Sequence, residues 1–145
     1  MLIGDLINSG AIPALEMTAK FAAARQTLIA HNIANIDTPD FIPTDLSPTD
    51  FQRAMRDAVE RRRARTGGET GDLEFKSTDQ VHVASDGRIV AKPRPAGGML
   101  LHDRNNRDVE RLMQSNAENV SAFRVSTELL RSRYALLTAA IEERP

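Results

Sequence analysis

The sequence predicts a mainly α-helical protein, in which long N- and C-terminal helices pack as an antiparallel coiled-coil-like hairpin around an irregular middle insert. Apolar residues recur at alternating spacings of three and four near both ends of the chain. Most prolines and glycines fall between these ends. We therefore divide the chain into an N-terminal helix (1–36), a middle insert (37–104) that is partly flexible, and a C-terminal helix (105–145).

Composition narrows the class of function. The 145 residues are the size of one ordinary domain, and 19 basic residues balance 20 acidic ones. This balance argues against binding nucleic acid or anionic lipid, which requires a clear basic excess. Cysteine is absent, which excludes disulfides and thiolate metal sites. No apolar run is long enough to span a membrane, and residues 1–5 lack the features of a cleavable signal peptide.

The first helix is predicted from Pro13 to Asn35. Proline suits the first turn of a helix, and no further proline or glycine follows until Pro39. Two apolar seams make a face wider than a two-stranded coiled coil needs, so we expect this helix to touch more than one neighbour. The residues that we expect at its interface are Leu15, Met17, Phe21, Ala22, Leu28 and Ile29.

The last helix is predicted from Asn105 to Glu143. Its seam alternates four and three throughout, and eight of its ten positions are apolar. A heptad pattern of this length indicates a coiled coil of roughly 50–60 Å. One hairpin has too few layers to bury both apolar faces, so the pattern predicts assembly with other chains. The expected interface residues are Asn105, Asn106, Val109, Met113, Val120, Phe123, Leu130, Tyr134, Leu137 and Ile141.

The middle insert is predicted to hold one short helix and a small β-hairpin. Ser47 followed by Pro48 is typical of a capped helix start, and the helix is expected to fade at the arginine-rich run 61–65. Short strands are expected at 73–75, 81–84 and 88–90, the last two joined by an Asp-Gly turn. Residues 93–95 and 97–98 are interpreted as linker.

The segment with the most specific sequence pattern is residues 29–41, where residues that terminate helices follow the end of the predicted helix. Asn35 and Asp37 tolerate the turn conformations that end helices, and Pro39 excludes Thr38 from the helical region. Asn32 and Asn35 project from nearly one face, and their amides suit binding a neighbour's backbone. The expected assembly motif comprises Ala30, Asn32, Ile33, Ala34, Asn35, Asp37, Thr38, Pro39 and Phe41.

This segment resembles the signature of the bacterial flagellar basal body rod protein family, Ala-Asn-Asn-Ile-Ala-Asn followed by Thr-Pro-Gly-Tyr. Within the family the match is closest to the proximal rod proteins. A second likeness supports it, because Asn105–Glu110 is similar to the Gly-Asn-Asn-Val-Asp segment that opens their last helix. Asp40 and Phe41 replace the usual Gly-Tyr, and Arg104 and Arg107 also depart from the pattern.

The resemblance implies a structural subunit of the hollow drive shaft that transmits torque in the flagellar basal body. Such subunits are exported by the flagellar export apparatus without a cleaved signal peptide, and they assemble helically in the periplasm. The implied partners are other copies, other rod proteins and the small FliE-type adaptor, with no nucleic acid and no direct lipid contact. No cofactor, metal ion or catalytic residue is expected.

Other readings remain open at this point. The chain is alternatively another axial rod protein of the FlgC type, or a cytosolic helical adaptor. The arginine-rich run 61–65 is either a basic docking patch or a solvated helix end. His31, His82 and His102 show no metal-ligand spacing. An enzyme is the weakest option, because no set of acid–base partners converges.

Overall fold

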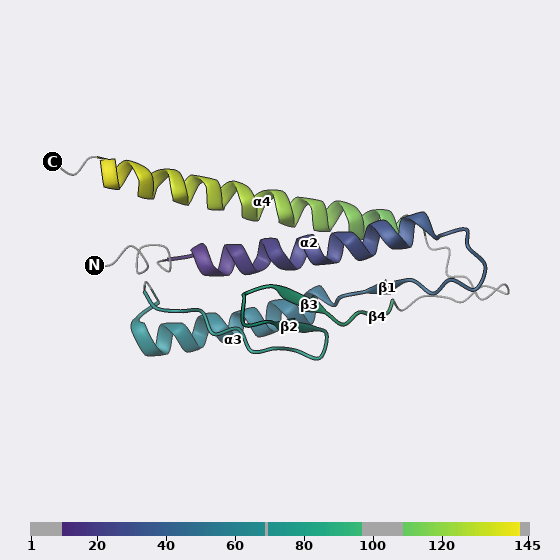
Figure 1. Cartoon of the computed structure of the whole chain (residues 1–145), viewed down its shortest axis with the longest axis horizontal. Coiled ribbons are helices and arrows are strands. Elements are labelled where there is room, and N and C mark those ends of the chain that lie inside the picture. Colours follow the sequence, from purple (N-terminus) through teal and green to yellow (C-terminus); the bar gives the residue numbers. More distant parts are fainter. Residues whose placement is uncertain (1–9, 69, 97–108, 143–145) are drawn as a thin grey trace.

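The computed structural model describes residues 10–68, 70–96 and 109–142, which form a mainly helical protein. The described helices are α2 (Ile12–Ala34), α3 (Pro48–Thr66) and α4 (Val109–Glu142). Figure 1 shows α2 in the middle layer, with α4 along one side and α3 with the short strands along the other. The long N- and C-terminal helices therefore pack together, as predicted.

The ends of the helices follow local sequence signals. α2 begins one residue before Pro13 and ends one residue before the predicted boundary at Asn35. α4 occupies 109–142 of the predicted helix, whereas the predicted end positions 105–108 and 143 lie outside the described residues. α3 begins as predicted, because the Ser47 hydroxyl oxygen accepts a hydrogen bond from the Asp50 N–H (3.2 Å).

The end of α3 corrects a prediction. The helix does not fade at the arginine-rich run but continues through it to Thr66. Arginine is a good helix former, so a run of arginines has no intrinsic reason to break the helix. The break comes at Gly67, which adopts the left-handed conformation (φ 77°) and donates its N–H to the Arg63 carbonyl (2.9 Å).

The predicted hairpin is present. Strands β2 (Val81–Val83) and β3 (Ile89–Ala91) pair antiparallel, with Val81 opposite Ala91 and Val83 opposite Ile89. Gly87 in the connecting turn has φ 75°, which a glycine adopts without strain. The Lys20 ammonium group donates to the Gly87 carbonyl (3.1 Å), which ties the turn to α2.

Two other predictions for the middle segment are wrong. Residues 73–75 form no strand, since within the described residues they have no ladder partner. Residues 94–95, interpreted as linker, form strand β4 (Arg94–Pro95), which pairs antiparallel with β1 (Thr44–Asp45). A two-residue strand containing proline has no recognisable periodicity, so its pairing depends on the tertiary structure.

The hydrophobic core lies between α2 and the middle segment. Phe21 of α2 stacks on Phe51 of α3, with ring centroids 4.0 Å apart and planes only 8° from parallel. Leu46 and Val81 complete the buried cluster. The wide face of α2 thus has two neighbours, as its two seams predict, but the second neighbour is the middle segment of the same chain rather than another copy.

The contact between α2 and α4 is antiparallel. Gln26 bonds to Asn116 near one end, and Glu16 bonds to Tyr134 near the other, so the numbering of the two helices runs in opposite directions. The face of α4 differs from the predicted seam. The buried residues of α4 are Asn119 and Ser126, and Asn119 lies one position before Val120 of the predicted interface. The helix is therefore rotated so that small polar side chains, rather than valine, meet α2.

Candidate assembly interface

The segment 29–41 forms the end of α2 and the turn that leads into β1. Asn32 is buried (2% exposed), and its side chain binds the backbone of Thr44. The Asn32 Nδ2 donates to the Thr44 carbonyl (2.7 Å), and the Asn32 Oδ1 accepts from the Thr44 N–H (3.1 Å). The expectation that this amide binds a neighbour's backbone is therefore corrected, because it binds β1 of its own chain.

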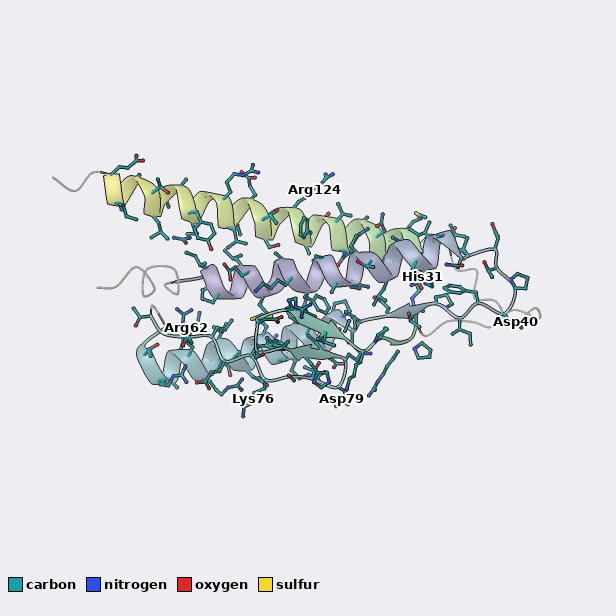
Figure 2. The ribbon with its side chains drawn as sticks, in the orientation of Figure 1. His31, Asp40, Arg62, Lys76, Asp79 and Arg124 are labelled. Atoms are coloured by element: carbon teal, nitrogen blue, oxygen red, sulfur yellow. The ribbon has the colours of Figure 1, made fainter. Side chains whose placement is uncertain are left out.

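The turn after α2 is closed by local bonds. Asn35 donates its side-chain N–H to the His31 carbonyl (2.9 Å), and its own carbonyl accepts from the Thr38 N–H (2.9 Å). Asp40 has φ 59° and is the one non-glycine residue with a positive φ among the described residues. This is the position where the family signature has glycine. Figure 2 shows Asp40 at the far tip of the loop.

Other members of the motif lie on the surface of this end of the molecule. The Phe41 ring packs against His31, with centroids 5.4 Å apart. Ile33 is half-buried. The exposed members of the motif are Ala30, Ala34, Asp37, Thr38 and Pro39. The motif therefore has a structural side, formed by Asn32 and the turn bonds, and a second side whose residues are exposed on the surface.

Sequence reasoning missed an ion pair that fixes the same region. Arg25 is buried (6% exposed), and its Nε and Nη2 donate to the two carboxylate oxygens of Asp45 at 2.8 and 2.6 Å. Asp45 also accepts from the Leu46 N–H (2.8 Å). Bidentate arginine–carboxylate pairs are strong and directional. The signal available in the sequence was the position of Arg25, four residues after Phe21 and four before Ile29, on an apolar face of the helix. A charged side chain that is buried on such a face requires a partner.

The arginine-rich run of α3 has a structural role. Arg62 is buried and donates to the carbonyls of Gly10 (2.7 Å) and Thr70 (3.3 Å). Arg61 donates to the Glu74 carbonyl (3.0 Å), and Arg65 pairs with the Glu74 carboxylate. Figure 2 shows Arg62 beside the start of α2. These side chains hold the segment after α3 in place, which differs from both the docking-patch and the solvated-end interpretations.

Polar side chains set the register between α2 and α4. The Asn119 Nδ2 donates to the Ala22 carbonyl (2.9 Å) and to Oε1 of Gln26 (2.8 Å). The Gln26 Nε2 in turn donates to Oδ1 of Asn116 (2.8 Å). A sliding movement of one helix would leave the buried Asn119 amide without partners, which is costly. One register is therefore favoured over the others.

A second polar contact lies nearer the start of α2. The Tyr134 hydroxyl donates to the Glu16 carboxylate (2.8 Å). This hydrogen bond, together with partial burial and the negative charge of Glu16, raises the pKa of Tyr134 above its ordinary value.

A groove runs between α3 and α4, with α2 as its floor. Its volume is about 440 Å³, and apolar side chains of α2 and α3, including Phe21, Met55 and Val59, line most of it. Glu118, Asn119 and Ala122 form the α4 wall. A smaller share of the lining is charged, from Arg56, Glu60 and Arg63.

Most of the exposed large apolar side chains of the described residues lie on α4. A 34-residue helix that has α2 on one side leaves most of its circumference uncovered. Eight large apolar side chains remain at least 38% exposed along it, namely Val109, Met113, Phe123, Val125, Leu129, Tyr134, Leu136 and Ile141. Monomeric proteins rarely expose large contiguous apolar patches, so a helix with this many exposed apolar side chains is a candidate contact surface. These eight side chains are the candidate assembly interface.

The predicted interface residues divide into two groups. Those of α2 lie inside the molecule, because Phe21, Ala22 and Ile29 are buried and Met17 and Leu28 pack against the core. Leu15 is half-buried. Those of α4 mostly remain accessible, although Val120, Leu130 and Leu137 are half-buried. Asn105 and Asn106 lie outside the described residues. Sequence reasoning missed Val125, Leu129 and Leu136, which form a second row on the same helix.

No family model and no curated protein matches this sequence. Within residues 10–68, 70–96 and 109–142, no three acidic or histidine side chains are grouped as a metal ion would require. None of the described helices is long and apolar enough to span a membrane.

Proposed function

We propose that this chain is a structural subunit of the bacterial flagellar basal body rod, closest to the proximal rod protein FlgB. The observation that carries the proposal is the combination of the 29–41 motif with an apolar α4 that one chain leaves uncovered. In this role α2 and α4 act as an antiparallel coiled-coil-like pair, and α4 supplies the surface on which other subunits stack.

Burial of the exposed α4 side chains by a partner would be favourable in free energy. Fully burying one large apolar side chain contributes about 1.5–3 kcal/mol. The eight α4 side chains are roughly half exposed, so each has on the order of 1 kcal/mol still to gain from a partner. Their sum is comparable to the loss of freedom on association, which favours assembly on a template over spontaneous aggregation.

The middle segment supports a rigid subunit. The Phe21–Phe51 stack, the Arg25–Asp45 pair and the Asn32–Thr44 bonds all join α2 to the middle segment. A subunit of a shaft that transmits torque must pass force between its faces without deforming. Buried, fully bonded polar groups of this kind hold one arrangement of a core. The rod partners of the subunit would be other copies, other rod proteins and the FliE-type adaptor.

The proposal is tested in the bacterium that encodes the chain. Deleting the gene should abolish motility, and purified basal bodies from the complemented strain should contain the protein in their rods. Leu129→Glu, in the exposed face of α4, should abolish rod assembly while the protein accumulates normally. Val90→Glu is the matched control, because Val90 is equally exposed (49%) but lies on β3, away from α4.

Other outcomes separate the alternatives. Recovery of the protein only from the cytosol, with intact rods in the deletion strain, would establish a helical adaptor instead. Recovery at a rod level above the most proximal one would favour a FlgC-like subunit.

A further inference from the structure

α4 carries two apolar rows on opposite flanks of the face that meets α2, and every member except the half-buried Val120 is exposed. The first row is Val109, Met113 and Val120; the second is Val125, Leu129 and Leu136. Counting about 100° per residue from the buried Asn119, the first row lies about 100° to one side and the second about 100° to the other. Neither row is covered by α2, and each can face a different neighbour.

The two rows have identical spacing. Within each row the steps are four and then seven residues, and every member of the second row follows its counterpart in the first by 16 positions. The positions between them also match, because Ser132 follows the polar Asn116 by the same interval. A shift of 16 residues along a helix is about 24 Å.

We propose that α4 of a second copy packs parallel to α4, shifted by about 24 Å, so that the second row of one copy meets the first row of the next. Val125 then faces Val109, Leu129 faces Met113 and Leu136 faces Val120. This inference rests on the proposed function, since it names the contact by which rod subunits stack.

Parallel packing of the two α4 helices is favoured over antiparallel packing, because it brings matching side chains together. In the parallel arrangement the apolar members face one another, and the two polar members, Ser132 and Asn116, also face each other. In the antiparallel arrangement that keeps Val125 opposite Val120, Leu129 would instead face Asn116, and Met113 would face Ser132. Placing an amide against leucine costs free energy that the parallel contact avoids.

The charges along the outer side of α4 are compatible with this contact. Glu142 of one copy comes level with Ser126 of the next. Arg124, which Figure 2 shows on the side of α4 that faces away from α2, comes level with Ala140 of the preceding copy. Glu128 comes level with Leu112 of the next copy and pairs with Arg131 of its own helix (3.4 Å). At this shift no charged side chain of α4 within 109–142 comes level with another, so the contact places no like charges directly opposite each other.

The contact joins different surfaces of two copies. In any pair, one copy still has an unused first row and the other an unused second row. Further copies can therefore be added at both ends, and the assembly does not close into a ring or dimer. A heterologous contact of this kind generates a polar, open-ended stack in which all copies point the same way. A symmetric contact between two second rows would stop at a dimer.

The test uses cysteine pairs, for which the natural absence of cysteine gives a clean background. Leu129→Cys and Met113→Cys are introduced singly and together into the full chain, which is then oxidised at increasing concentration. A disulfide requires the two Cα atoms to approach within about 7 Å. The double variant should give a ladder of multimers, and an equimolar mixture of the two single variants should give dimers only. Both substitutions are at half-exposed positions, so circular dichroism should show unchanged helix content.

A register control sharpens the result. The pair Val125→Cys and Met113→Cys is 12 positions apart and so lies one helical turn out of register, which should reduce cross-linking at least tenfold. Efficient cross-linking of Leu129→Cys with itself would overturn the proposal in favour of a symmetric dimer. Absence of cross-links in the double variant would overturn it as well. If the protein is nevertheless found in basal body rods, the proposed function stands and only this contact is wrong.

Discussion

Replacing Asn32 by alanine should destabilise the fold far more than the same change at Asn35, although both belong to one motif. Asn32→Ala removes two hydrogen bonds to the Thr44 backbone. Each backbone group left without a partner costs about 1–3 kcal/mol. Thr44 is half-buried, so water can form part of the hydrogen bonding that its backbone loses. We therefore expect a decrease of about 2–4 kcal/mol in the free energy of unfolding.

Asn35→Ala is the matched control. Its amide makes one bond, to a helix-end carbonyl that solvent can also reach, so the expected cost is below about 1 kcal/mol. Urea unfolding followed by circular dichroism measures both values, and Asn32→Ala should lower the melting temperature by on the order of 8 °C. Hydrogen exchange at the Thr44 amide reports the lost bond directly. Equal destabilisation by the two variants would refute the assignment of Asn32 to the fold.

Three further predictions concern single contacts. Asp40→Val should destabilise by about 1–2 kcal/mol, since a β-branched residue fits a positive φ poorly, whereas Asp40→Gly should be neutral or stabilising; thermal melts of both variants check this. The raised pKa of Tyr134 means that its stabilising contribution is present below about pH 10 and is lost as the pH rises through the folded-state value. Urea titrations from pH 8 to 11 should therefore show a steeper loss for wild type than for Tyr134→Phe, and parallel curves would contradict it. Arg25→Met should cost at least about 2 kcal/mol by leaving Asp45 unpaired, and adding Asp45→Asn should recover part of that loss in a double-mutant cycle.

The elements of the fold could largely be predicted because their signals are local. Helical periodicity places both ends of α2 within one residue, the Ser47 cap marks the start of α3, and Asp86-Gly87 marks the hairpin turn. Each signal depends on the conformational preferences of a few neighbouring residues. The pairing of β1 with β4 could not be predicted, because it joins residues some 50 positions apart through only two residues on each strand.

The candidate site was predicted in part. The exposed apolar character of α4 follows from its sequence. The second row, including Leu129, was missed, because α4 has apolar residues on several flanks. The sequence alone does not reveal which of these flanks α2 covers. That choice depends on Asn119 meeting the Ala22 carbonyl and Gln26, a contact between residues about 95 positions apart. Ser126 provides the close approach further along the same face.

The sequence by itself determined which segments are helical, where α2 begins and ends, where α3 begins, and that α4 is more apolar than one chain can cover. Those properties arise from spacing and backbone preference, which act over a few residues. Only the tertiary structure decided that the second seam of α2 is buried by its own middle segment and that Asn32 binds Thr44. It also decided which face of α4 turns toward α2. These outcomes depend on the simultaneous fit of side chains from distant parts of the chain, and no local pattern encodes that fit.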